Sequence, residues 1–157
     1  MPLLPVGSQA PDFEARHVDG TSLRLRDLRG RYVLVYFYPK DMTPGCTVEA
    51  CTINDGFQLF QDSGAEVIGV SFDGWEKHRQ FQAKHDLQFA LAADGDGGIA
   101  KSYGVGRMLG ILPVARRVSF LVDPQGEVVE VWPAVSPRRH AEEVLEAIAR
   151  HRSAVTA

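Results

Sequence analysis

The run from Tyr32 to Tyr38 constrains the fold most, because all seven of its residues are apolar or aromatic. A strand that is buried on both faces carries a continuous run of this kind, and Pro39 ends it. Seven residues are too few to cross a bilayer, which needs about 20 in a helix. We therefore expect a central strand in a sheet that helices cover on both faces.

The rest of the chain predicts alternating helices and strands, without a linker or an internal repeat. Phe13 to Leu25 predicts a hairpin that turns at Asp19-Gly20. A helix is expected to start at Thr43 as N-cap and Pro44 as first residue, and to run to about Asp62 before Gly64. The other expected strands are Ala65 to Phe72, Phe89 to Ala93, Val114 to Val122 and Glu127 to Trp132. The other expected helices are Trp75 to Asp86, Ile99 to Tyr103 and an amphipathic helix after Ser136-Pro137 that carries Val144, Leu145 and Ile148.

This order predicts an α/β protein with a central mixed β-sheet, flanking helices and an N-terminal β-hairpin. It is compatible with a thioredoxin-like fold, and at this length we expect residues 1–157 to form a single domain. Asp73 is expected to cap the helix from Trp75, with Glu76 completing a capping box.

The charge balance excludes some classes of partner. The chain has 17 basic and 20 acidic residues, a net charge of −3. A nucleic-acid or anionic-membrane binder needs a concentrated positive field, so neither partner is expected. The clusters 138–140 and 150–152 are interpreted as solvated helix ends. The N-terminus lacks the pattern of a signal peptide, so we expect a cytoplasmic protein, in which a disulfide is catalytic or sensing rather than structural.

Two glycine-containing segments fail as ligand-binding motifs. Asp94 to Gly98 opens like a calcium loop, but its twelfth position is Val105, which has no carboxylate. Lys101-Ser102 lacks the glycine that precedes the lysine of a phosphate loop. The five histidines show no metal-ligand spacing, and His78 and His85 are interpreted as solvated surface of a helix. We expect neither a metal nor an organic cofactor.

Cys46 lies in the first turn of the helix expected from Pro44. Unpaired N–H groups and the positive end of the helix dipole favour an anion there, and therefore the nucleophilic thiolate. Thr43 can place a hydroxyl beside the sulfur, and Pro39 can exclude water. The alternative is that Cys46 and Cys51 pack as small hydrophobic residues. That alternative does not account for a helix start built from Thr, Pro and Gly directly at the thiol.

The pattern Pro39-x-x-x-Thr43-x-x-Cys46 resembles the active-site signature of the peroxiredoxins. With Cys51 five residues later, the longer run is similar to the PrxQ or bacterioferritin-comigratory-protein subfamily. Gln9 to Phe13 and Arg117 to Asp123 resemble the opening and a late strand of the family, so the resemblance covers nearly the whole chain.

The resemblance implies a role for each residue of this motif. Cys46 would be the peroxidatic cysteine and Cys51 the resolving one. Thr43 and Arg117 would bind the peroxide and orient the thiolate, while Pro39 would shield it.

Strand geometry also bears on which of two neighbouring arginines, Arg116 or Arg117, has this role. Neighbours on a strand face opposite ways, so only one of Arg116 and Arg117 can reach the thiolate. The family pattern falls on Arg117, and Glu49 matches a position that supports it. The segment Gly106 to Ala115 is shorter than in many members, so the pocket rim and the surface that docks a reductase are expected to differ.

The activity implied is that of a thiol peroxidase acting on hydrogen peroxide and organic hydroperoxides. Cys46 would become a sulfenic acid and then form an intrachain disulfide with Cys51, which thioredoxin or a glutaredoxin-type dithiol would reduce. Such a bridge needs no second subunit, so we expect a monomer. Two other functions stay open: a peroxide-responsive redox sensor, and a disulfide oxidoreductase, against which the absence of a C-x-x-C motif argues.

The spacing of the cysteines also predicts motion. Five residues apart on a helix, their Cα atoms are about 8–9 Å apart, beyond the roughly 7 Å limit for a disulfide. The helix is therefore expected to unwind from Pro44 through at least Cys51 before the bridge can form.

Overall fold

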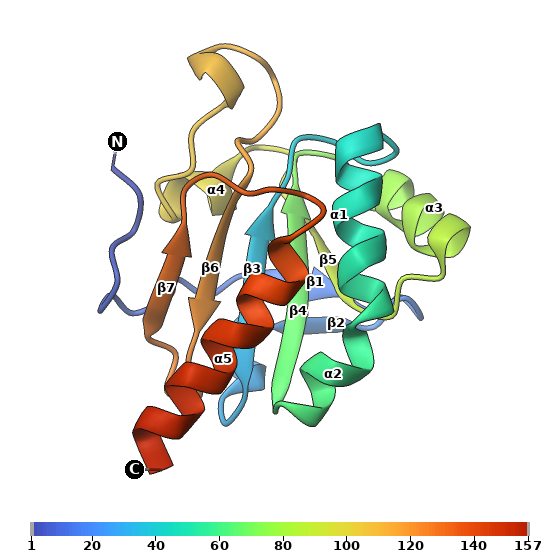
Figure 1. The fold of residues 1–157 in the computed structure, drawn as a ribbon. Helices are drawn as coiled ribbons and strands as arrows, with labels where there is room; N and C mark the ends of the chain where they lie inside the picture. The colour runs from blue at the N-terminus through green and yellow to red at the C-terminus, as the bar shows by residue number, and fades with distance from the viewer. Residues whose placement is uncertain (1, 157) are drawn as a thin grey trace.

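A mixed seven-stranded sheet organises the computed structural model, which describes residues 2–156 (Figure 1). The strand order is β2-β1-β5-β4-β3-β6-β7. The strands are β1 (Glu14–Arg16), β2 (Ser22–Arg24), β3 (Tyr32–Phe37), β4 (Ala65–Ser71), β5 (Ala90–Ala93), β6 (Val118–Val122) and β7 (Val128–Trp132). The helices are α1 (Pro44–Asp55), α2 (Phe57–Asp62), α3 (Trp75–His85), α4 (Gly98–Ser102) and α5 (His140–Thr156), with 3-10 turns at Leu25–Leu28 and Met108–Gly110.

The predicted central strand is confirmed. β3 is parallel to β4 and antiparallel to β6, and all six of its residues are buried. Because side chains alternate along a strand, Leu34 and Tyr36 face a core shared with α1, α2, α3 and α5. Val33 and Val35 face the opposite core, where α4 and the N-terminal segment pack. Helices therefore cover both faces of the sheet, as predicted.

The N-terminal hairpin is also confirmed. β1 and β2 pair antiparallel with Ala15 opposite Leu23. Gly20 in the connecting turn has a φ of 87°, a conformation that glycine adopts without strain. β1 also pairs with β5, which makes the hairpin one edge of the sheet.

The prediction of one helix from Pro44 to about Asp62 is wrong at its centre. α1 ends at Asp55, and α2 begins at Phe57. Gly56 lies between them with φ −92° and ψ 8°, and glycine is a poor helix former. The chain therefore bends after the first helix (Figure 1).

Three polar residues behave differently from the prediction. Gly74, not Asp73, is the N-cap of α3. His78 was expected on the solvated surface, but its side chain is fully buried. His140, expected at a solvated helix end, is also fully buried at the start of α5. Both histidines point into the sheet, where buried polar groups from other strands and loops hold them by hydrogen bonds.

Within the described residues, no helix combines the length and apolar character that a membrane span requires.

Candidate active site

The N-terminus of α1 presents the thiol of Cys46. Thr43 occupies the N-cap position with φ −80° and ψ 152°, and Pro44 is the first helical residue, as predicted. The Thr43 hydroxyl does not cap the helix; it donates to the carbonyl of Lys40 at 2.7 Å. Cys46 follows in the first turn and is 1% exposed. The helix start therefore positions a buried sulfur beside unpaired backbone N–H groups.

Arg117, the residue before β6, reaches across to this sulfur. Its Nη2 lies 3.4 Å from the Sγ of Cys46, and its Nη1 donates to Oε1 of Glu49 at 2.6 Å. A Cβ at Gly45 would lie 3.1 Å from the same Nη2, so glycine leaves room for the guanidinium. One planar cation is thus fixed between a carboxylate and the thiol.

Glu49 is the buried anchor of this cation. Burial raises the pKa of Glu49 to about 7, although the charge and hydrogen bond of Arg117 act in the opposite direction. Burial alone would lower the pKa of Arg117, but the charges of Cys46 and Glu49 raise it. The second oxygen of Glu49 has no hydrogen-bond partner. The structure therefore keeps a buried carboxyl group in place to hold the arginine.

A buried imidazole lies near the same arginine. His140 Nε2 is 2.8 Å from the Ser119 hydroxyl, and its ring packs edge-on against Trp132 with centroids 5.2 Å apart. Burial, and then the charge of Arg117, lower the pKa of His140 to about 4. His140 is therefore neutral at pH 7, and it adds no second positive charge beside the guanidinium.

A second buried network fixes the loop that joins β3 to α1. Asp41 accepts from the Tyr38 hydroxyl at 2.5 Å, and its other oxygen lies 2.6 Å from His78 Nδ1. The backbone N–H of Asp41 donates to Asp73 at 2.8 Å. Met42 follows with a φ of 69°, a conformation that side chains rarely adopt. This network anchors the residues that carry Thr43.

The same network contains a group of three potential metal ligands. In the described part of the chain, one ligand atom each from Asp41, Asp73 and His78 lies within 4.8 Å of the other two. Their donors and acceptors are already used within the protein. His78 Nε2 bonds the carbonyl of Ala92 at 2.9 Å, and Ser71 donates to Asp73 at 2.6 Å. The cluster therefore stabilises the loop between β3 and α1 by hydrogen bonds.

Cys51 lies further along α1, and both cysteines are free thiols. Its Sγ is 3.8 Å from Nδ1 of His85, which comes from α3. Burial, and then the charge of Asp55, raise the pKa of Cys51. The helix is continuous between the two cysteines, so they are not placed to bond in this state.

The remaining predicted site residue, Pro39, is half-buried directly after Tyr38. The loop and β6 thus bring Pro39, Thr43, Cys46 and Arg117 to one end of the sheet. The sequence did not reveal that His140, Tyr38 and Asp41 support them.

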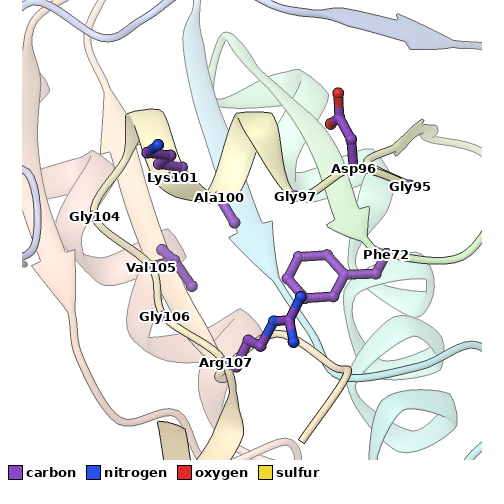
Figure 2. A pocket seen from close by; sticks show the side chains of 10 residues that line it. All are labelled: Phe72, Gly95, Asp96, Gly97, Ala100, Lys101, Gly104, Val105, Gly106 and Arg107. Carbon is purple, nitrogen blue, oxygen red and sulfur yellow. The ribbon is translucent and has the colours of Figure 1, made fainter. Parts of the chain in front are cut away.

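A cavity of about 300 Å³ is lined by residues other than those of this cluster (Figure 2). It is lined by Phe72, Lys101, Arg107 and the backbone of nearby glycines, with neither cysteine among them. The segment 106–115 leads from it and extends away from the sheet (Figure 1). Leu109 and Ile111 there are 83% and 78% exposed.

Comparison with known proteins agrees with this geometry. A model of the AhpC/TSA family matches residues 6–131. Peroxiredoxin Bcp of Bacillus subtilis is 37% identical over 153 residues, covering 92% of this chain and 95% of that protein. Peroxiredoxin Bcp of Escherichia coli K12 is 36% identical over 152 residues, covering 94% and 97%.

Solved structures give the same answer. Peroxidoxin BcpB of Mycobacterium tuberculosis superposes with a TM-score of 0.85 at 33% identity, covering 94% of this chain and 97% of that one. The bacterioferritin comigratory protein of Xanthomonas campestris, studied for its alkyl peroxide reduction activity, gives 0.83 at 35% identity with the same coverage. The thioredoxin-like fold is thereby confirmed. The chain therefore belongs to the AhpC/TSA family, and within it to the peroxiredoxins of the Bcp and PrxQ group, which are thiol peroxidases.

Proposed function

We propose that this peroxiredoxin reduces hydrogen peroxide and organic hydroperoxides, with Cys46 as the peroxidatic and Cys51 as the resolving cysteine. The observation that carries this proposal is the contact between the Arg117 guanidinium and the Cys46 sulfur at a helix N-terminus. The guanidinium and the helix end both favour a thiolate, the form that attacks peroxide. The alkyl peroxide reduction reported for the Xanthomonas relative supports the organic substrates.

The first step follows from the placement of these groups. The Cys46 thiolate attacks one peroxide oxygen, the O–O bond breaks, and the leaving oxygen departs as water or alcohol after taking a proton. Arg117 stabilises the negative charge that develops on the oxygens. The Thr43 hydroxyl donates its hydrogen bond to the Lys40 carbonyl. The lone pairs of the hydroxyl oxygen are therefore available to accept a hydrogen bond from the peroxide O–H. Pro39, which has no N–H, shields the sulfur without competing for the thiolate.

The second step joins the cysteines. The Cys51 sulfur attacks the sulfenic acid of Cys46 and displaces water, which leaves an intrachain disulfide. The continuous helix Pro44–Asp55 must open first, because the Cα atoms in it are about 8–9 Å apart. A dithiol protein, thioredoxin or a glutaredoxin-type reductant, then restores both thiols by exchange. The intrachain bridge supports a monomer, and the dependence on a dithiol supports a cytoplasmic location.

The experiment that tests this proposal uses the Cys51→Ser variant. It should consume one equivalent of peroxide, and dimedone should then label Cys46. The wild type should instead form the disulfide and turn over with a thioredoxin or a glutaredoxin system, tested separately with hydrogen peroxide and an alkyl hydroperoxide. Absence of the dimedone label would contradict the assignment of the two cysteines, and absence of turnover with either system would favour a sensor. Size-exclusion chromatography tests the monomer.

A further inference from the structure

The thiol of Cys51 has a partner from another helix. Nδ1 of His85, the last residue of α3, lies 3.8 Å from the Sγ of Cys51. The His85 ring also packs edge-on against Phe81 with centroids 5.3 Å apart, so the imidazole has a fixed orientation. A backbone carbonyl in this place could only accept a hydrogen bond from the thiol, whereas the unprotonated nitrogen of an imidazole can also take the proton of the thiol away.

Hydrogen bonds from Asn54 hold α1 against the end of α3. The Asn54 side-chain amide donates to the carbonyl of Asp86 at 3.0 Å, and its oxygen accepts from the backbone N–H of Gln88 at 2.8 Å. Asn54 lies three residues after Cys51, on the far side from Cys46. The segment from Pro44 through Cys51 can therefore unwind while Asn54, three residues later, keeps Cys51 near His85.

The second chemical step needs a base at this position. A thiol attacks a sulfenic acid as its thiolate, and burial and the Asp55 charge both raise the pKa of Cys51. Cys46 has Arg117 and a helix N-terminus to favour its thiolate, whereas Cys51 lies in the third turn of the helix without either. Its hydrogen-bonding contact is His85.

We propose that His85 is the general base for resolution: its unprotonated Nδ1 takes the Cys51 proton as Cys51 attacks the sulfur of oxidised Cys46. The S–S bond forms, the S–O bond of the sulfenic acid breaks, and hydroxide leaves as water with the proton returned from the imidazolium. No external oxidant or reductant enters this step. The inference rests on the proposed function, since it requires the sulfenic acid on Cys46.

Charged residues adjoin both members of the pair. Asp55 of α1 acts on Cys51, and Lys84 and Asp86 flank His85 at the end of α3; all three are exposed. Lys84 offers the matched control, because Lys84→Gln removes a positive charge at the same helix end and leaves the base in place.

The experiment compares wild type, His85→Gln and Lys84→Gln in a single turnover. Each reduced protein is mixed with one equivalent of hydrogen peroxide and quenched at intervals. Peroxide loss reports the first step, and mass spectrometry after alkylation reports disulfide formation. At pH 7, His85→Gln should consume peroxide at the wild-type rate but form the disulfide roughly a hundredfold more slowly, the low end of what general base catalysis contributes. Lys84→Gln should behave as wild type.

The pH profile and imidazole distinguish a base from a structural support. The defect of His85→Gln should shrink as the pH rises and the thiol ionises unaided, and added imidazole should restore part of the rate. A wild-type rate of disulfide formation in His85→Gln would overturn the inference. A defect that is equal at every pH and insensitive to imidazole would overturn it too, and would assign His85 a packing role. Failure of the wild type to consume peroxide would refute the proposed function instead.

Discussion

Replacing Glu49 by Gln separates the energetic cost of a buried charge from its use in holding Arg117. The pKa of Glu49 is raised from its ordinary 4.5 to about 7, mainly by burial. Between these values the folded chain holds more protons than the unfolded chain. Its contribution to stability is therefore complete below pH 4.5 and is lost as the pH rises through about 7. At 1.36 kcal/mol per pH unit, the loss amounts to about 3 kcal/mol.

His140 titrates in nearly the same interval with the opposite sign. Its pKa is lowered from 6.5 to about 4, so its contribution is complete above pH 6.5 and is lost as the pH falls toward 4. In the wild type the two changes offset each other. Glu49→Gln removes the first and leaves the second.

Relative to wild type, the free energy of unfolding of Glu49→Gln should therefore rise with pH from 4.5 to 7, by about 3 kcal/mol, and then level off. Urea unfolding of both reduced proteins at pH 4.5, 6 and 8 measures this difference, and titrating groups common to both cancel. The variant should also react more slowly with peroxide at pH 8, because a neutral amide holds Arg117 less firmly than a carboxylate. A difference in stability that does not change with pH, or that falls as the pH rises, would refute the reasoning.

Three further predictions address Arg117, the buried pair Asp41–His78 in the loop before α1, and the motion of α1. Arg117→Met should slow the reaction with peroxide by at least about tenfold in a stopped-flow assay, because it removes a donor to the negative charge that develops on oxygen. Arg116→Met should change the rate little in the same assay, and the reverse result would assign the role to Arg116. His78→Leu should destabilise the protein by about 3–5 kcal/mol in urea, because the buried Asp41 then keeps only the Tyr38 hydroxyl as a side-chain partner. A change below about 1 kcal/mol would show that the pair is dispensable. Hydrogen exchange over residues 44–55 should be slow in the reduced protein and fast in the oxidised one; equal protection with the disulfide confirmed would contradict the opening of the helix.

Most helices and strands of this fold could be predicted from local sequence patterns. The apolar run of β3, the Asp19-Gly20 turn and the Thr43-Pro44 helix start each depend on residues that are neighbours in sequence, so pattern and structure agree. The prediction failed at Gly56, where one glycine between two helical segments allows a bend that periodicity does not show.

The buried polar residues that support the site could not be predicted from local patterns. His78 and His140 look like surface residues because their partners are far along the chain: Asp41 is 37 residues from His78, and Ser119 is 21 residues from His140. The contact between Cys51 and His85 spans 34 residues in the same manner. A buried polar residue depends on a partner that only the tertiary fold supplies, and a single sequence carries no local signal of that pairing.

The thiol of Cys46, which α1 presents beside Arg117, is the group that we propose reduces peroxide. The most direct measurement is the loss of hydrogen peroxide in a single turnover, with wild type and Cys46→Ser compared under identical conditions. Serine is not ionised at neutral pH, so Cys46→Ser should consume peroxide no faster than buffer, while the wild type consumes one equivalent. Consumption by Cys46→Ser at a rate near that of the wild type would contradict the account.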